Sequence, residues 1–192
     1  MSETRIDSLE NKLTAMMQNR ANCRERLAEI EADEHLSSTG RHTEAVEFYE
    51  KAKAKHEELK ASYEAEVQTL RESLRKEAFS PKFGYLTDQA TKVATRAAYA
   101  AAMDRAAGMS TEELRAALER ALRADDELSA QAIAHVAWEK GESRVIERFM
   151  EHDKNGDLRR LYEFEASYGD RRTVQKKFAH KVAFSMPEWP TF

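Results

Sequence analysis

The sequence predicts an all-α protein: a long N-terminal antiparallel helical hairpin (coiled coil), followed by a compact bundle of shorter helices and an extended C-terminal tail. The first observation is the scarcity of helix breakers, because 6 Gly and 3 Pro in 192 residues leave few turn residues for a sheet. The second is the composition, which is 34% charged and 41% hydrophobic and rich in Ala, Glu, Arg, Lys and Leu, as is typical of long helices. The third is a heptad spacing of apolar residues near the N-terminus.

These patterns divide the chain into four expected segments. We assign residues 1–78 to the hairpin, 79–85 to a hinge, 86–184 to the bundle and 185–192 to the tail. The net charge of −4 resides in the first segment, which has 13 Lys/Arg and 17 Asp/Glu, while the rest has 18 of each. This balance gives the whole chain no general attraction to nucleic acid.

The first arm of the hairpin follows a narrow apolar stripe. Its steps alternate between three and four residues, a heptad seam suited to one partner helix. The seam residues are Ile6, Leu9, Leu13, Met16, Cys23, Leu27 and Ile30. Arg20 occupies one seam position, where we expect its stem to pack while its charge reaches the edge. The arm ends near Leu36, and Ser37-Ser38-Thr39-Gly40 predicts a short turn in which Gly40 takes the left-handed conformation.

The second arm is predicted to begin near Thr43 and to run antiparallel to the first, because the turn is short. Its seam residues are Ala45, Tyr49, Ala52, His56, Leu59, Tyr63, Val67, Leu70 and Leu74. Two successive steps of four, from Leu59 through Tyr63 to Val67, indicate a stutter that relaxes the supercoil.

Residues 40–52 resemble the second helix of a tetratricopeptide repeat. Ala45 and Ala52 stand at its small positions and Tyr49 at its aromatic position. The positions of the preceding helix depart from that family's pattern, both arms exceed its repeat length, and no second copy follows. The resemblance therefore implies close packing of helices and not membership of the family.

The hinge and the segment after it combine aromatic residues with an Ala-rich helix. Pro81 cannot continue the helix before it, so the hairpin ends here. Phe79, Phe83 and Tyr85 are candidates for docking a partner. We expect residues 86–107, with their many alanines, to form a central buried helix that ends at Gly108.

The rest of the bundle is expected to consist of short helices joined by brief turns. Ser110 and Glu113 form a capping box, and Ser143 is expected to cap a later helix. Expected helices run from Ser110 to Arg123, from Asp125 to just before Gly141, from Ser143 to Met150, from Leu158 to Gly169 and from Arg171 to Phe184.

The last helix and the tail carry the remaining candidates for binding. Arg171, Arg172, Lys176, Lys177 and Lys181 place several cations along one helical side and could contact phosphates. The alternative is a solvated basic face opposite a side that packs through Phe178 and Val182. The tail places Met186, Trp189 and Phe192 three residues apart in a Pro-containing segment, a pattern suited to a groove on this molecule or on another subunit.

No motif indicates catalysis, a cofactor or a metal. Asp153, Asn155 and Asp157 lack the Gly and Glu that a calcium loop needs at its sixth and twelfth places, so they predict a turn. The histidines lack the spacing of a zinc site, and the single Cys23 has no partner thiol. We therefore expect no enzyme activity, no cofactor and no metal.

The leading hypothesis is a non-enzymatic helical protein–protein interaction module. It would have a structural, scaffolding or adaptor role in an assembly, such as a bacterial or phage particle, with a protein partner or self-association. Alternatives are a nucleic-acid-binding protein that uses residues 171–181, and an enzyme or inhibitor whose site the sequence does not reveal. Because the chain has a single Cys and no long apolar run, we expect it to be cytoplasmic, or assembled into a particle made in the cytoplasm.

Overall fold

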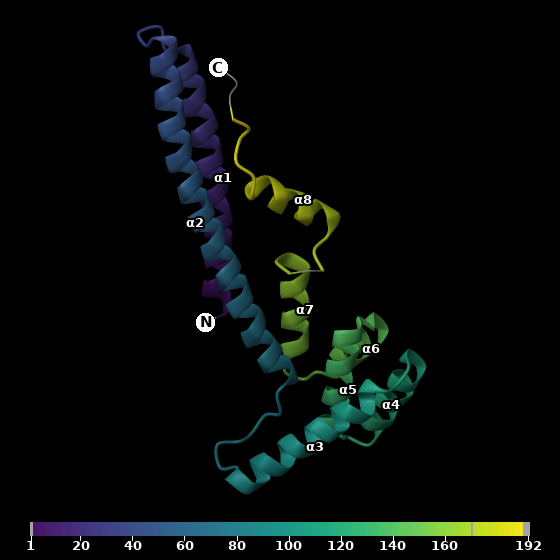
Figure 1. The fold of residues 1–192 in the computed structure, drawn as a ribbon. Coiled ribbons are helices and arrows are strands. Elements are labelled where there is room, and N and C mark those ends of the chain that lie inside the picture. Colours follow the sequence, from purple (N-terminus) through teal and green to yellow (C-terminus); the bar gives the residue numbers. More distant parts are fainter. Residues whose placement is uncertain (1, 170, 190–192) are drawn as a thin grey trace. The chain divides into compact units, whose positions relative to one another are not determined.

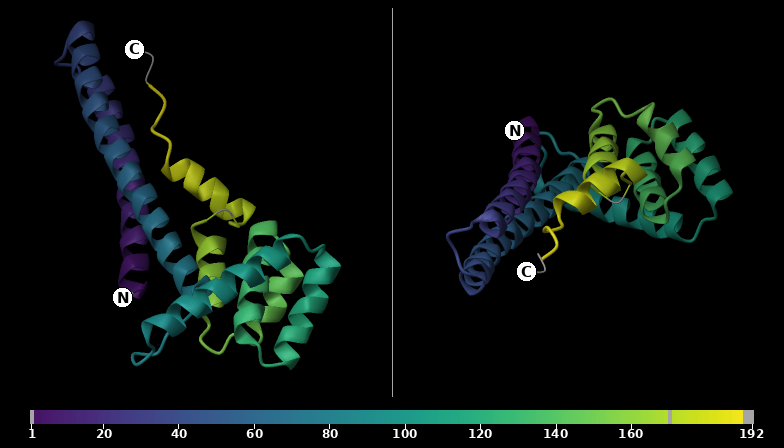
Figure 2. Two further views of the ribbon diagram at one scale, coloured as in Figure 1. Left: turned by 60° about the horizontal axis from the view of Figure 1, so that its bottom comes forward. Right: turned by 90° about the horizontal axis from the view of Figure 1, so that it is seen from above.

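The fold is all-α, as the sequence predicts. The computed structural model describes residues 2–169 and 171–189, with side chains from Ile6 onward, and no strand occurs in these ranges. Figures 1 and 2 show the helices, most of which follow one another through short connections, with a longer one, residues 80–88, between α2 and α3. They are α1 (Ser2–Ala32), α2 (Ser38–Phe79), α3 (Gln89–Ala107), α4 (Thr111–Arg123), α5 (Glu127–Lys140), α6 (Ser143–Met150), α7 (Asp157–Ser167) and α8 (Val174–Ala183).

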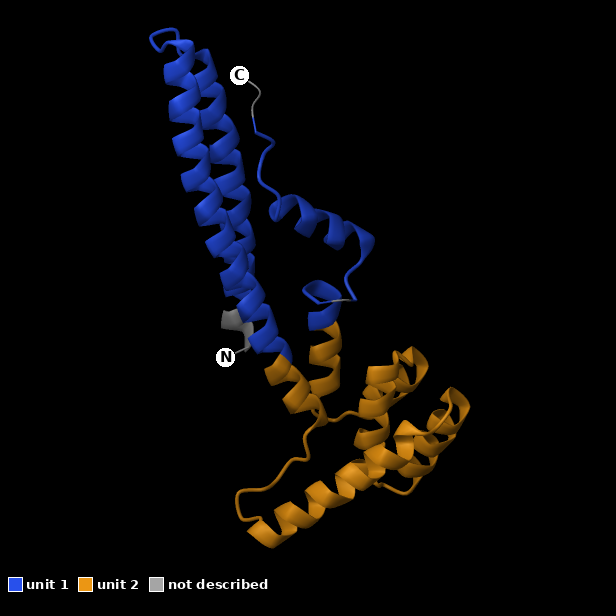
Figure 3. Ribbon diagram, in the orientation of Figure 1, with its two compact units in different colours: residues 1–71, 164–192 blue, residues 72–163 orange. Residues whose placement is uncertain are grey.

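The chain divides into two compact units (Figure 3). Unit 1 comprises residues 1–71 and 164–192, and unit 2 comprises residues 72–163. This division differs from the expected boundaries, which placed residues 86–184 in one bundle. The end of α7 and all of α8 belong with the hairpin, because α8 packs against α1.

In unit 1, α1 and α2 lie side by side and run in opposite directions (Figures 1 and 2). Asn19 donates a hydrogen bond of 2.9 Å to the backbone carbonyl of Ala52. Further along α1, Arg26 forms an ion pair of 2.8 Å with Glu44. The residue numbers rise along one helix as they fall along the other, which is the antiparallel pairing expected for a hairpin.

The seam side chains lie mostly between the two helices. Those that are buried are Leu9, Met16, Cys23, Leu27, Ile30, Ala45, Ala52, His56, Tyr63, Val67, Leu70 and Leu74. Four expected members are only half-buried, namely Ile6, Leu13, Tyr49 and Leu59.

The turn of the hairpin differs from the prediction. The second helix begins at Ser38, before Thr43, and Gly40 lies inside its first turn without a positive φ. Ser37 explains the early start, since its hydroxyl accepts a hydrogen bond of 3.1 Å from the Gly40 amide. Ser37, which the sequence placed in the turn, therefore caps α2.

Unit 2 is built around α5, which packs against α3, α4 and α6. The predicted capping box of α4 is present, because Ser110 and Glu113 exchange both hydrogen bonds. The N-cap of α6 is Glu142, whose side chain makes no capping bond, so the prediction that Ser143 caps this helix is wrong. The main core side chains come from four helices: Leu114, Leu118, Ala132, Ala134, Ala137, Val145, Ile146, Leu158 and Leu161.

The Ala-rich α3 is not the central buried helix that its composition predicts. Only Tyr99, Ala102 and Ala106 are buried, on the side that packs against α5. The other alanines of the helix are exposed to solvent. Alanine is a strong helix former at exposed and buried positions alike, so its abundance indicated a helix but not its burial.

Candidate protein-interaction surfaces

The C-terminal tail docks on the hairpin of its own chain. The hydroxyl of Tyr49 donates a hydrogen bond of 3.3 Å to the carbonyl of Pro187. The ring of Trp189 meets that of Tyr49 edge-on, with centroids 4.8 Å apart. Met186 packs against the buried cluster that α1 and α2 form around Cys23. The proposed docking residues Met186 and Trp189 are therefore engaged within unit 1, and Phe192 lies outside the described residues.

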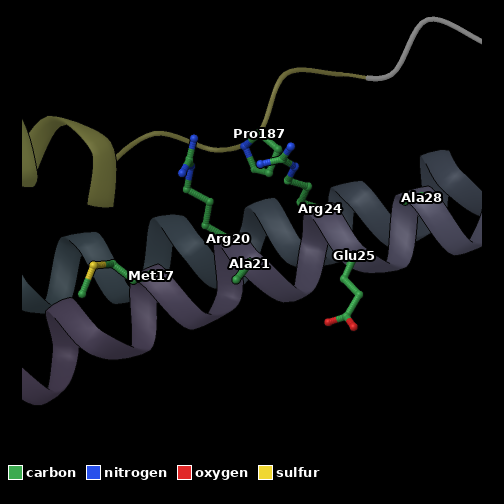
Figure 4. Close-up of a pocket in the computed structure, with 7 residues that line it drawn as sticks. All are labelled: Met17, Arg20, Ala21, Arg24, Glu25, Ala28 and Pro187. Carbon is green, nitrogen blue, oxygen red and sulfur yellow. The ribbon is translucent and has the colours of Figure 1, made fainter.

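A groove of about 420 Å³ runs along α1 beside the tail (Figure 4). Arg20 and Arg24 extend toward the tail on either side of Pro187, while Glu25 points away from it (Figure 4). Met17 and small side chains, including Ala21, provide the apolar lining. The groove thus has a basic rim, and the tail covers one of its sides.

The two arginines of this groove lack acidic partners. Neither Arg20 nor Arg24 forms an ion pair with any residue in the described ranges. The Nε of Arg20 is buried and has no hydrogen-bond partner there. We expected the aliphatic stem of Arg20 to pack on the seam while its charge reaches the edge, and the half-buried position of the side chain agrees with this. Its Nε, however, is withdrawn from water.

The three aromatic residues of the hinge have different environments. Phe79 is buried and stacks on His135, with ring centroids 4.3 Å apart. Phe83 is half-buried, with the guanidinium of Arg96 at 5.4 Å from its ring centroid. Tyr85 is fully exposed. Of the three hinge candidates for docking, only Tyr85 presents its whole side chain to solvent.

The helix α8 packs on the hairpin through a polar residue. His180 is 8% exposed, and its Nε2 lies 3.3 Å from the hydroxyl of Tyr63. Its Nδ1 lies 2.6 Å from a guanidinium nitrogen of Arg172. Burial, followed by the positive charges of Arg172 and Lys176, lowers the pKa of His180 to about 4. Ala183 completes the buried side of α8.

The opposite side of α8 is apolar and basic. Val174 is 84% exposed and Phe178 is 68% exposed. Lys177 and Lys181 are exposed as well, and the spacing of three, four and seven residues places all four side chains on one face. We call Val174, Lys177, Phe178 and Lys181 the α8 face. The expectation that Phe178 packs inward is wrong, while Val182 is half-buried.

The fold separates the five basic residues that the sequence offered as candidates for phosphate contacts. Arg172 turns inward, donating to the Gly169 carbonyl at 2.7 Å and to His180. Lys176 donates to the hydroxyl of Ser167 at 3.0 Å, and Arg171 is half-buried. Lys177 and Lys181 remain exposed on the α8 face, so the five cations do not form a single strip.

The turn around Asp153 is a helix cap in the structure. Its carboxylate accepts hydrogen bonds from the amides of Asn155 at 3.2 Å and Leu158 at 2.9 Å. Asp157 is buried and pairs with Lys82 and Arg160. Across the described residues, no group of three or more His, Cys, Asp or Glu side chains is arranged to hold a metal ion.

The sequence did not predict the α8 face, because the apolar Phe178 was assigned to the core. The buried place on α8 is taken instead by a histidine, which is polar.

Comparisons with known proteins give no relative from which a function could be transferred, because the chain matches no protein-family model, no curated protein and no solved structure. Within the described part of the chain, no helix combines the length and the apolar character needed to cross a membrane.

Proposed function

We propose that this protein is a non-enzymatic structural module that self-associates, with the α8 face of one copy docking on the hairpin of a second copy. The observation that carries this proposal is the exposure of Val174 and Phe178 beside two lysines on a helix whose other side is already buried. A large apolar side chain in such a setting is characteristic of an interaction surface.

The energetic reason is the cost of leaving these side chains in water. Burying a Phe or a Val side chain contributes about 1.5–3 kcal/mol. Aromatic residues are also among those enriched in the centres of protein interfaces. Two apolar side chains do not cover a whole interface, since specific interfaces bury about 1,000 Å² or more in total. The α8 face is therefore the proposed centre of a larger contact.

Charge supports a second copy as the occupant. Residues 171–181 carry five Lys/Arg and no acid, whereas residues 1–78 carry a net charge of −4. Glu31 on α1 and Glu34 in the turn after it are exposed, and neither forms an ion pair within the described ranges. Lysines of one copy would approach such carboxylates of the next, which favours encounter and fixes orientation.

The geometry of such a contact favours extended assembly. The α8 face and the acidic hairpin surface are different patches, so their contact is heterologous and can be repeated from copy to copy. Heterologous contacts build rings or filaments, which are suited to a scaffolding or other structural role. A long, charged hairpin presents an extended surface on which such contacts can form.

Sedimentation velocity over a range of protein concentrations and salt tests the proposal. We expect species heavier than the 22.0 kDa monomer at low salt, and fewer of them at high salt because the lysine contacts are screened. Phe178→Ser should weaken association by about tenfold or more, as loss of the buried ring predicts.

Tyr85→Ser provides a matched control, because Tyr85 is another exposed aromatic residue and lies in unit 2. It should leave association unchanged. A strict monomer under all conditions would refute self-association. A loss of association in Tyr85→Ser but not in Phe178→Ser would show that the α8 face is not the contact.

A further inference from the structure

Unit 2 contains a cavity whose lining combines cations with aromatic rings. The cavity measures about 710 Å³ and is formed by the end of α2, the hinge, α3 and α5. Arg75, Lys76 and Arg96 line it, together with aromatic side chains and no carboxylate. Its volume falls within the range of about 300–1,000 Å³ that is typical of small-molecule sites.

The described residues of the protein do not neutralise the three cations. Within the described residues, none of Arg75, Lys76 and Arg96 forms an ion pair, and all three side chains are exposed. Four other cations of unit 2 do form ion pairs, namely Lys82, Arg148, Lys154 and Arg160, and Arg148 lies 2.6 Å from Glu119. The positive charge at the cavity is therefore local and uncompensated, in a unit that has no excess of basic residues.

The aromatic part of the lining is held in place by its own contacts. The rings of Phe79 and His135 are parallel to within 5°, with centroids 4.3 Å apart. Nδ1 of His135 lies 3.1 Å from the hydroxyl of Tyr99, which is itself buried. Burial and the nearby charge of Arg75 act to lower the pKa of His135, although Glu139 opposes this shift. His135 is thus an uncharged, packed ring in the wall at neutral pH, and the positive charge comes from the three cations.

We propose that this cavity binds a small organic phosphate that carries a planar ring, of the mononucleotide class. The phosphate would contact Arg75, Lys76 and Arg96, since guanidinium groups match phosphate oxygens in pairs and Lys supplies a further charge. The ring would lie against the aromatic wall around Phe79, Phe83 and Tyr99. This function is separate from self-association and uses no residue of the α8 face.

Isothermal titration calorimetry of the full chain with adenosine monophosphate tests the site. We expect saturable binding. Adenosine should bind more weakly because it lacks the phosphate, and inorganic phosphate should bind more weakly because it lacks the ring. Arg96→Gln and Arg75→Gln should each reduce the affinity by about tenfold or more, the loss expected for one charge-assisted contact. Circular dichroism of each variant confirms that it is folded.

Arg115→Gln is the matched control, because Arg115 is exposed on α4, in the same unit, and forms no ion pair with the described residues. It should leave the affinity unchanged. The proposal is overturned if adenosine monophosphate does not bind at low salt, or if Arg115→Gln weakens binding as much as Arg96→Gln. It is also overturned if a short single-stranded DNA binds while adenosine monophosphate fails to compete, since the surface would then serve nucleic acid.

Discussion

Arg172 and His180 are joined by a contact of 2.6 Å that determines which ring nitrogen of the neutral imidazole carries the proton. A guanidinium has only donors, so Nδ1 of His180 must accept this hydrogen bond. The neutral ring therefore carries its proton on Nε2, which donates to the hydroxyl oxygen of Tyr63 at 3.3 Å. Burial disfavours the charged ring, and protonation of Nδ1 would also set an N–H against an N–H of Arg172, so the folded protein favours neutral His180.

The first prediction is that unit 1 loses stability as the pH falls. The pKa of His180 is lowered from 6.5 to about 4, so the unfolded chain binds a proton before the folded one does. The stability present above pH 6.5 should be lost as the pH falls toward about 4, by on the order of 1–3 kcal/mol. Urea unfolding of the wild type and of His180→Gln should show a smaller pH dependence in the variant over this interval.

A direct measurement does not depend on the variant's folding. The chemical shift of the ring C–H protons of His180, followed by NMR as the pH is lowered, should change with a midpoint near 4. A midpoint at the ordinary value of 6.5 would mean that burial and the charge of Arg172 do not hold the ring neutral in solution.

A second prediction concerns the hairpin seam. Leu9 has no exposed surface, so Leu9→Ala should lower the free energy of unfolding by about 2–5 kcal/mol through lost burial and a residual cavity. Leu86→Ala removes the same atoms from a side chain that is 92% exposed, and it should change stability very little. Chemical denaturation of both variants compares the two sites. Equal effects would show that the seam around Leu9 is not packed as described.

A third prediction tests the capping box of α4. The Ser110 amide donates to the carboxylate of Glu113 at 2.8 Å, and the Glu113 amide donates to the Ser110 hydroxyl at 3.4 Å. Ser110→Ala should lower the free energy of unfolding by about 0.5–2 kcal/mol. Ser143→Ala is the control, since Ser143 is exposed at the start of α6 and caps nothing. Thermal unfolding should distinguish the two variants. If Ser110→Ala left the stability unchanged, the capping box would not contribute to the stability of the protein.

The sequence predicted those features that depend on neighbours close in the chain. The heptad steps identified the buried seam from Leu9 to Leu74, because a period of 3.5 residues keeps those side chains on one side of each helix. The capping box at Ser110 was predictable for the same reason, as both of its partners lie within one turn. Gly40 was wrongly taken for a helix stop, because Ser37 caps α2 before it.

The orientation of α8 was not predictable from local pattern. Both sides of this helix carry large side chains, and apolarity alone favours burying Phe178 and not His180. The polar His180 can be buried because it meets Tyr63, which lies 117 positions earlier in the sequence, and Arg172. Only the tertiary structure brings that partner into reach, so a sequence pattern could not reveal which side of α8 would be left for a partner.

The fourth prediction concerns Gly169, which is buried just after α7, near the start of unit 1's second segment. A methyl group there would overlap the carboxylate of Glu165 and lie 2.9 Å from its backbone Cα. That carboxylate is paired with Arg71 at 2.7 Å, so its displacement would disturb a largely buried ion pair. Gly169→Ala should therefore destabilise the protein by about 1–3 kcal/mol, as overpacking does.

Gly108→Ala isolates the steric effect of the added methyl group. No atom lies within 4 Å of a Cβ at Gly108, and its φ of −79° suits any L-residue. This substitution should be neutral or slightly stabilising, because it restricts the unfolded chain without a clash. Urea unfolding of the two variants in parallel provides the comparison. If Gly169→Ala were as stable as Gly108→Ala, the close approach of Glu165 to Gly169 would not exist in solution, and neither would the constraint that it places on the ion pair with Arg71.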